Sequence, residues 1–361
     1  MENQRKGINE FLPLEILRST LLRVLIKPLV RLKQVCIMWY NLISDHDFAK
    51  SHFDQSFARG HTCIFIQKES PKAYFVDLDT LPQEDSNAII SVSLPFKWKT
   101  EFTFLGTCRG IVLLHSQPQF LVFWNPTTKS RKGISYSHMF DAARRFGEYN
   151  SPVALKAFNI LRDTLLHGFG YDELEEDYIA VFAYRSQDEK NHFDIHWLGR
   201  NSSISLDWKS PGLFCNHAIH WSSDSKSQEI LIFDLKGRAF SKISMPEELE
   251  HTSESRLALL GGCLALYSSD GHKTDVWVMK EYKKLSSWFC YEIPNPSFGP
   301  LCLSGDGDII GYCDGSDDEI GFCVFNVGQK LLTVRYVYGV ILNYTDYIVY
   351  EDSLLQLPGS I

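Results

Sequence analysis

The sequence predicts a mainly β protein with a small helical module at its N-terminus, and three observations lead to this fold class. Apolar residues recur at helical spacing up to about residue 53 and at a spacing of two after about residue 60. Aromatic residues make up 13% of the chain, which favours strands. A strand-rich unit then recurs along the rest of the chain, as in a β-propeller.

The helical spacing over residues 12–52 predicts a bundle of three short helices, with a last short helix after them. Pro13 stands where the first helix begins and Pro28 near the start of the second, where the missing N–H costs little. Asp45 is suited to cap the last helix. Helices of about ten residues are marginal alone, so they must pack on one another and on something else.

The repeated unit is an alternating strand with an aromatic residue near its end, a polar turn and a second strand. It centres on six aromatic residues, which are Phe75, Phe123, Phe182, Phe233, Trp277 and Phe325. The spacings of 48, 59, 51, 44 and 48 residues are close to the ~50-residue period of kelch-type blades. A third strand-like run precedes many units, so six irregular four-stranded blades are expected.

The two zones divide the chain into a flexible N-terminus at residues 1–11, a helical module at residues 12–56 and a propeller-like domain at residues 60–361. A ring of blades protects its strand edges only when the ring is complete. Residues 61–66 are therefore expected to pair with a strand at residues 340–350.

Charge, hydropathy and cysteine content limit the class of protein. The formal net charge is −8, which gives no overall case for nucleic-acid binding. Residues 1–53 carry +3 and the remainder −11, so the helical module favours an acidic partner. No apolar run approaches the ~18 residues of a membrane span, and no apolar signal segment begins the chain. The nine cysteines include no CxxC pair, so reduced, mostly buried thiols inside the cell are expected.

Residues 12–53 read LPLEILRSTLLRVLIKPLVRLKQVCIMWYNLISDHDFAKSHF. The opening Leu-Pro, the spaced basic residues at 23, 27, 31 and 33, Val-Cys at 35–36, Trp39 and Leu-Ile-Ser-Asp at 42–45 follow a specific order. This segment resembles an F-box, the short helical module that docks on a Skp-type adaptor.

The rest of the chain carries a second series of short motifs. They are TCRG at 107–110, WNPTT at 124–128, GFGYD at 168–172, DY at 177–178, HW at 220–221, FDL at 233–235, LGGCL at 260–264, DVWVMKEY at 275–282 and PLC at 300–302. This series resembles the plant F-box-associated domain, whose relatives include the S-locus F-box type.

The combined resemblance implies a plant substrate receptor of an SCF-type ubiquitin ligase, located in the cytoplasm or nucleus. It implies docking on a Skp-type adaptor, and through that adaptor on cullin and RING subunits, while the propeller binds an unidentified target protein. It implies no active site, cofactor or metal in this chain, and no nucleic-acid or membrane partner. The predicted adaptor-binding residues are Leu12, Pro13, Ile16, Leu17, Leu25, Ile26, Lys27, Leu29, Val30, Arg31 and Trp39.

Two departures from the F-box pattern leave a second function open. The family usually has leucine and proline after the arginine at the second helix, where this chain has Val24-Leu25 and places Pro28 later. It often has Lys-Ser before the tryptophan, where this chain has Ile37-Met38. The alternative is a non-catalytic interaction scaffold whose degenerate F-box no longer joins a ligase.

Trp39 and Val35 are expected to be the most internal of the module's apolar residues.

Other patterns favour structural roles. The His192/His196 and His217/His220 pairs lack further ligands at a zinc spacing. Residues 304–319 lack the order of a calcium loop, so a solvated turn is expected. Residues 172–177 form an acidic turn that is expected to be solvated, with recognition of a basic target left open. Cys263 lies in an apolar strand and no G-x-S-x-G elbow occurs, so an enzyme is the weakest of the three functions.

Overall fold

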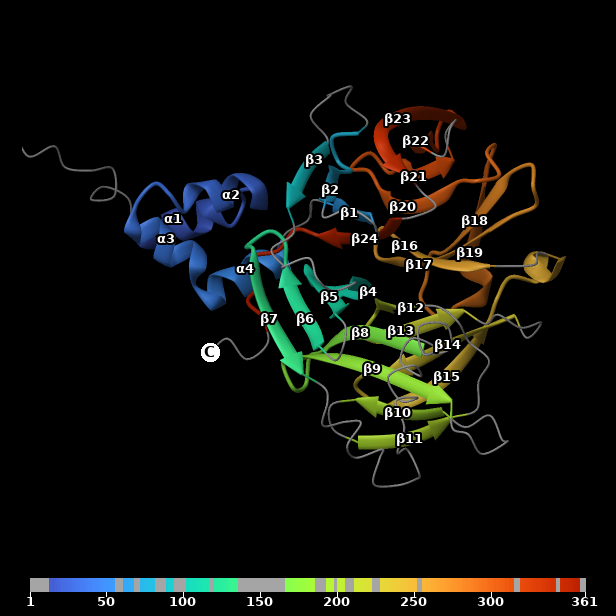
Figure 1. The fold of residues 1–361 in the computed structure, drawn as a ribbon, viewed down its shortest axis with the longest axis horizontal. Coiled ribbons are helices and arrows are strands. Elements are labelled where there is room, and N and C mark those ends of the chain that lie inside the picture. Colours follow the sequence, from blue (N-terminus) through green and yellow to red (C-terminus); the bar gives the residue numbers. More distant parts are fainter. Residues whose placement is uncertain are drawn as a thin grey trace, which may run out of the picture.

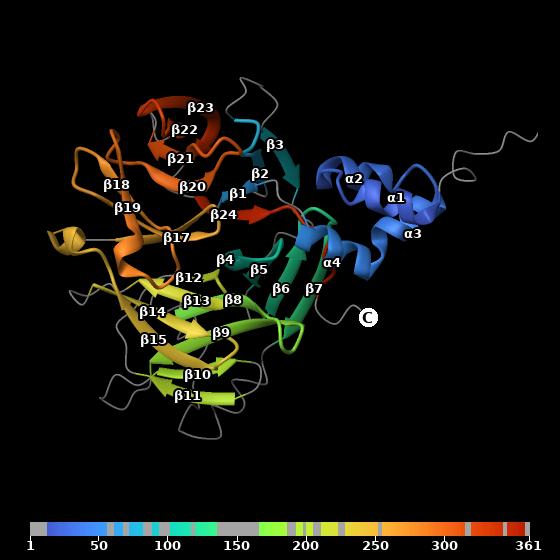
Figure 2. The ribbon, with the colours of Figure 1, turned by 180° about the vertical axis from the view of Figure 1, so that it is seen from behind.

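The computed structural model describes residues 13–55, 61–67, 72–81, 89–93, 102–116, 120–135, 166–185, 193–197, 200–204, 211–222, 228–251, 255–314, 319–341 and 345–357. In this part of the chain a helical module lies at one side of a ring of strands (Figure 1). The module faces β2 (Lys72–Asp77), β3 (Ile89–Ser93), β6 (Phe120–Asn125) and β7 (Ser130–Ser135), whereas β18 (Thr274–Met279) and β19 (Trp288–Ile293) lie at the opposite side of the ring. The view from behind shows the same arrangement (Figure 2).

Four helices form the module: three match the expected bundle and the fourth is the last short helix predicted after it, so the F-box has four helices instead of three. They are α1 (Leu14–Leu21), α2 (Ile26–Leu32), α3 (Ile37–Ser44) and α4 (His46–Gln55). Pro13 precedes α1 as its N-cap residue. Pro28 is the third residue of α2, where helix N–H groups have no intrahelical acceptor. The N–H of Phe48 donates to Asp45 Oδ1 at 2.9 Å, which confirms the predicted cap and separates α3 from α4.

The helices enclose a small apolar core of their own. Its buried members from the module are Leu17, Leu21, Ile26, Leu29, Ile43, Phe48, Ala49 and Phe53. Leu354 and Leu355, from the far end of the chain, complete the same cluster. The module therefore depends on contacts with the rest of the protein, as the shortness of its helices requires.

The strands of the described residues form five sheets. One contains β24 (Thr345–Glu351), β1 (His61–Gln67), β2 (Lys72–Asp77) and β3 (Ile89–Ser93), and the next contains β4 (Phe102–Cys108), β5 (Ile111–Ser116), β6 (Phe120–Asn125) and β7 (Ser130–Ser135). An eight-stranded sheet contains β8 (Leu166–Asp172), β9 (Asp177–Arg185), β10 (Phe193–Trp197), β11 (Arg200–Ile204), β12 (Pro211–Cys215), β13 (Ala218–Ser222), β14 (Glu229–Asp234) and β15 (Ala239–Ser244). The last two contain β16 (Arg256–Leu260), β17 (Cys263–Ser269), β18 (Thr274–Met279) and β19 (Trp288–Ile293), and β20 (Gly299–Leu303), β21 (Ile309–Asp314), β22 (Glu319–Asn326) and β23 (Leu331–Ile341). Two short 3₁₀ helices, Glu247–His251 and Leu285–Ser287, lie between strands.

The expected six separate blades are corrected to five sheets, because one sheet contains two four-stranded meanders. A parallel pair between β8 and β12 joins β8–β11 to β12–β15, with Gly168 opposite Gly212. A Cβ at either glycine would lie 2.5 Å from Ile219 Cγ2. The glycines of the GFGYD motif lie in strand β8 and thus allow neighbouring strands to pack closely.

The ring closes by pairing the first and last strands, as predicted. Strands β1 and β24 pair in antiparallel fashion from His61 opposite Glu351 to Gln67 opposite Thr345. In Figure 1 the red β24 lies beside the blue β1. Because these strands come from opposite ends of the domain, closure ties its two ends together and covers two strand edges.

Apolar clusters fill the interfaces between successive meanders around the ring. Phe123 of β6 packs on Phe169 of β8, with ring centroids 5.8 Å apart. The repeated aromatic residue of the sequence lies in the third strand of five meanders and in β9, the second strand of the sixth. The five of these aromatic side chains that the structure describes belong to the clusters between meanders; they are Phe75, Phe123, Phe233, Trp277 and Phe325.

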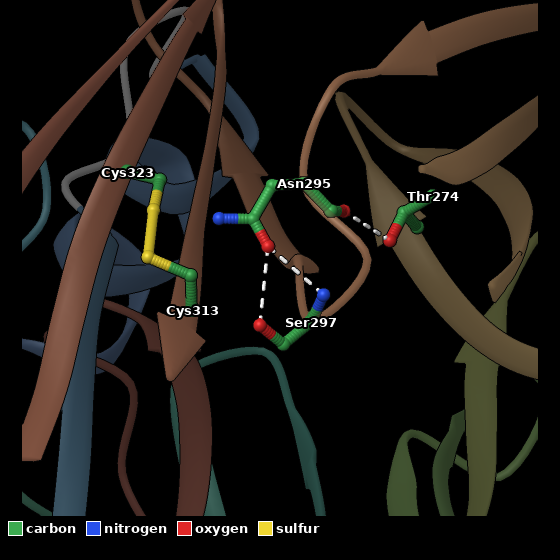
Figure 3. Close-up of a disulfide and its surroundings, with 5 residues drawn as sticks. All are labelled: Thr274, Asn295, Ser297, Cys313 and Cys323. Atoms are coloured by element: carbon green, nitrogen blue, oxygen red, sulfur yellow. Dashed lines mark hydrogen bonds between the residues drawn. A yellow bond between two sulfur atoms is a disulfide. The ribbon is translucent and has the colours of Figure 1, made fainter. Parts of the chain in front are cut away.

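A disulfide joins Cys313 and Cys323 of neighbouring strands β21 and β22, with Cα atoms 6.5 Å apart (Figure 3). The expectation of reduced thiols is wrong for this pair, although the other seven cysteines form no disulfide. Figure 3 also shows Asn295 beside the disulfide, where its Oδ1 accepts hydrogen bonds from the Ser297 N–H at 2.9 Å and hydroxyl at 3.1 Å. Thr274 Oγ1 donates to the Asn295 carbonyl at 2.7 Å.

Candidate functional site

The helical module exposes a group of large apolar side chains, which we call the module's apolar surface. Its members are Leu14, Ile16, Leu25, Val35, Ile37 and Tyr40, each more than half exposed. They belong to α1, α3 and the connections before and after α2. Exposed apolar groups of this density on so short a segment are typical of a surface that a protein partner covers.

The structure sorts the predicted adaptor-binding residues by exposure. Pro13, Ile16, Leu25 and Arg31 are exposed, and Val30 and Trp39 are half-buried. Leu17, Ile26 and Leu29 are buried in the module core and support the surface from beneath. Leu12 lies outside the described residues.

Sequence reasoning missed part of this surface. Val35 is 59% exposed, so the expectation that it is internal is wrong. Ile37, at 80% exposure, and Tyr40 flank Trp39 on α3. The sequence did indicate this exposed apolar area, because Ile37-Met38 replaces the Lys-Ser of the family pattern and adds apolar side chains to α3.

Lys27, one of the predicted adaptor-binding residues, forms ion pairs within the chain. Its Nζ contacts Asp77 Oδ2 and lies 3.6 Å from Asp352 Oδ2. Burial raises the pKa of Asp352 above its ordinary value, while Lys27 opposes this shift. Lys27 therefore joins the helical module to the first sheet and to the end of the chain.

Arg109 of the TCRG motif also lies at the junction of module and propeller. Its guanidinium lies 4.8 Å from the ring centroid of Phe53 in α4 and 4.1 Å from that of Tyr171 in β8. Its Nη2 is 3.9 Å from Asp54 Oδ1. A planar guanidinium between two aromatic rings suits both cation–π contacts.

The acidic turn at residues 172–177 is engaged within the chain. Buried Asp172 pairs with Arg238, and Glu175 lies 3.2 Å from the same guanidinium. Glu176 lies 2.8 Å from Lys50 of α4, and this pairing holds the pKa of Glu176 below its ordinary value. The turn is solvated as predicted, and the carboxylates of Asp172, Glu175 and Glu176 also form ion pairs within the chain.

His220 has the structural role that the sequence favours. It is fully buried, with Nδ1 3.2 Å from the Leu213 carbonyl and Nε2 2.9 Å from Tyr282 Oη. The carbonyl can only accept, so Nδ1 carries the proton and the Tyr282 hydroxyl donates to Nε2. Burial lowers the pKa of His220 to about 4, which keeps the ring neutral.

The described residues contain no group of three or more His, Cys, Asp or Glu side chains that could hold a metal ion. His192 and residues 315–318 of the acidic loop lie outside the described part, and the side chain of His196 is also not described. None of the described helices is long and apolar enough to cross a membrane.

The described part of the chain thus combines a ring of sheets with a helical module that exposes several large apolar side chains. Comparison with protein families agrees: residues 10–51 match the F-box domain and residues 62–336 match the F-box associated beta propeller domain. The chain belongs to the F-box proteins that carry this propeller domain.

Curated relatives and one solved structure illustrate the similarity. The F-box protein CPR1 of Arabidopsis thaliana is 25% identical over 77% of this chain and 71% of its own. The F-box/kelch-repeat protein At3g23880 of the same plant is 27% identical over 77% of this chain and 78% of its own. The crystal structure of AofleA from Arthrobotrys oligospora matches with a TM-score of 0.41 and 12% identity, over 81% of this chain and 89% of that one.

Proposed function

We propose that this protein is the substrate-recognition subunit of an SCF-type ubiquitin ligase. The module docks on a Skp-type adaptor, which connects it to cullin and RING subunits, and the propeller binds a target protein in the cytoplasm or nucleus. The chain itself is non-catalytic: it accelerates ubiquitin transfer by bringing the target near an active site in other subunits.

The observation that carries this proposal is the apolar surface of the helical module. Its six exposed large side chains lie within 27 residues, Leu14 to Tyr40, of the segment that matches the F-box domain. Leu354 and Leu355 complete the core of the module, and within the described residues the six side chains stay more than half exposed. A partner protein is the occupant that the family membership supports.

The test is adaptor binding by the full chain. A plant Skp-type adaptor should bind the purified protein at micromolar concentration or below, measured by calorimetry. Ile37→Asp should weaken binding at least tenfold, because it places a charge on the module's apolar surface.

The matched control is Leu285→Asp, which alters a side chain 52% exposed on the propeller. Its adaptor affinity should equal that of the unchanged protein. Absence of adaptor binding by the unchanged protein, or equal losses in both variants, would contradict the proposal.

The second candidate is a scaffold whose F-box no longer docks, and the observation that favours it is Leu25. This residue is the N-cap of α2 with φ −59°, a value that proline also adopts, and its side chain is 59% exposed. Leu25→Pro is therefore compatible with the backbone angle. A large gain in adaptor affinity on this change would favour the scaffold, whereas little change would show that the module already docks.

A further inference from the structure

The last described residues of the chain, 352–357, pack against both the helical module and the propeller. Leu354 and Leu355 are buried in the apolar cluster of the helices. Leu357 is buried in a different cluster, between the β4–β7 sheet and strands β8 and β9. Gln356 Nε2 donates to the carbonyl of Ser44, at the end of α3, at 3.3 Å. We call residues 352–357 the C-terminal segment.

Asn125 of the WNP motif holds the backbone of the C-terminal segment. Its side chain is fully buried, and its Nδ2 donates to the carbonyls of Ser353 at 3.0 Å and Leu355 at 2.9 Å. Its Oδ1 accepts a hydrogen bond from the Thr128 N–H at 3.1 Å. One buried amide thus closes its own turn and also holds the end of the chain.

Comparison with other sheets separates these two roles. Asp234, at the end of β14, accepts from the Gly237 N–H at 2.6 Å, and Asn326, at the end of β22, accepts from the Gln329 N–H at 2.7 Å. Capping the turn is therefore a repeated property of this strand end. The two donations from Asn125 to the C-terminal segment are additional.

Gly110, Thr127 and Lys27 also contact the C-terminal segment. Gly110 has φ +76°, and a Cβ there would lie 2.1 Å from the Ser353 Cβ, so glycine makes room for the chain. Thr127 Oγ1 donates to Asp352 Oδ1 at 3.0 Å, and Lys27 of α2 reaches the other oxygen of this buried carboxylate. The TCRG and WNP motifs thus meet at the junction.

Two other ion pairs across the junction have carboxylates that are more than half exposed. The pair Lys50–Glu176 is exposed on both sides, and Arg109 Nη2 is 3.9 Å from the half-exposed Asp54. Exposed pairs of this kind contribute little to stability. Parts of a chain move relative to one another unless the contact between them is large and apolar, and the C-terminal segment supplies buried apolar contact on both sides.

We propose that the C-terminal segment is a strap that fixes the orientation of the propeller relative to the helical module, and that Asn125 is the positioning residue that holds this strap. A fixed orientation matters to a receptor because a displaced reacting group reacts more slowly. This consequence for ubiquitin transfer rests on the function proposed above, whereas the coupling of the two parts does not.

The test measures the distance between module and propeller in the full chain. Spin labels are attached through bioorthogonal residues at the exposed positions Asn41 and Lys236, because the chain contains nine cysteines. The unchanged protein should give one narrow distance distribution. Asn125→Asp keeps an oxygen for the Thr128 N–H but loses both donations to the strap, so its distribution should be at least twice as wide.

The matched control is Asp234→Asn, which changes the equivalent strand end far from the junction and should leave the distribution narrow. A narrow, unshifted distribution for folded Asn125→Asp would overturn the proposal. Should the buried carboxylate prevent folding, Leu355→Ala loosens the strap without adding charge. The same broadening is expected there, and a narrow distribution would again overturn the proposal.

A second measurement tests the positioning role in the assembled ligase. Self-ubiquitination sites on propeller lysines, mapped by mass spectrometry, should spread to more lysines in Asn125→Asp, with adaptor affinity unchanged within twofold. An unchanged set of sites would overturn the positioning role. If the adaptor does not bind even the unchanged protein, the ligase function fails, but the distance measurement still decides whether the strap exists.

Discussion

The helical module and the propeller expose large apolar side chains in different ways. Six such side chains lie in the module, whereas those described on the propeller are spread over three sheets and their connections; they are Leu174, Leu285, Phe289, Leu331 and Val334. The module has one small core, completed by the end of the chain, while the propeller distributes its core over the interfaces around the ring. The difference teaches that a module of short helices buries its small core only with help from residues 352–357 and leaves apolar area exposed, whereas the sheets bury their apolar side chains against one another.

The largest expected effect concerns the small core of the module. Phe48 is fully buried and belongs to the apolar core of the module. Phe48→Ala should lower the free energy of unfolding of the module by ~3–5 kcal/mol, the usual cost of an emptied aromatic site. Hydrogen exchange should then show opening of α1–α4 while the sheets stay protected; equal loss of protection in both regions would contradict the difference drawn above.

The next effect concerns the pH dependence of the stability of the propeller. His220 has a pKa of about 4 when folded, against an ordinary 6.5, so the unfolded chain takes up a proton first as the pH falls. Its contribution to stability is complete above about pH 6.5 and is lost progressively down to about pH 4, a change of about 3 kcal/mol.

Denaturant unfolding at several pH values measures this loss. His115, whose pKa burial also lowers to about 4, adds to it, so His220→Asn should remove only part of the pH dependence. An unaltered slope in His220→Asn would show that this ring does not titrate as described.

A smaller effect is expected where β8 meets β12. Gly168→Ala places a Cβ within 2.5 Å of Ile219 Cγ2, so the sheet must shift, at a cost of ~1–3 kcal/mol. Gly133→Ala is the control, since a Cβ there meets nothing within 4 Å. Thermal unfolding should distinguish the two, and equal melting temperatures would argue against close packing at this pair.

The smallest effect concerns the cap of α4. Asp45→Ala removes the acceptor of the Phe48 N–H and should cost about 1 kcal/mol. The loss should appear as faster hydrogen exchange in the first turn of α4. Exchange that accelerates in the propeller instead would mean that the cap stabilises the junction and not the helix.

Local patterns were enough to predict much of the fold. Helical spacing, Pro13 and Asp45 located the helices, because caps and periodicity are properties of neighbouring residues. The recurring aromatic residue and its turn located the strand pairs and led to the pairing of β1 with β24. The sequence also indicated the module as the interaction surface, through its F-box pattern and its excess of apolar residues.

The remaining features depend on contacts between residues far apart in the chain, which no local pattern reports. The parallel pair of β8 and β12 reduces the expected six blades to five sheets. The partition of the predicted adaptor residues into exposed Ile16 and buried Leu29 depends on how the helices pack. In the sequence, Asn125 is recognisable only as part of the WNP motif. The tertiary structure alone brings the carbonyls of Ser353 and Leu355 within hydrogen-bond distance of its side-chain amide.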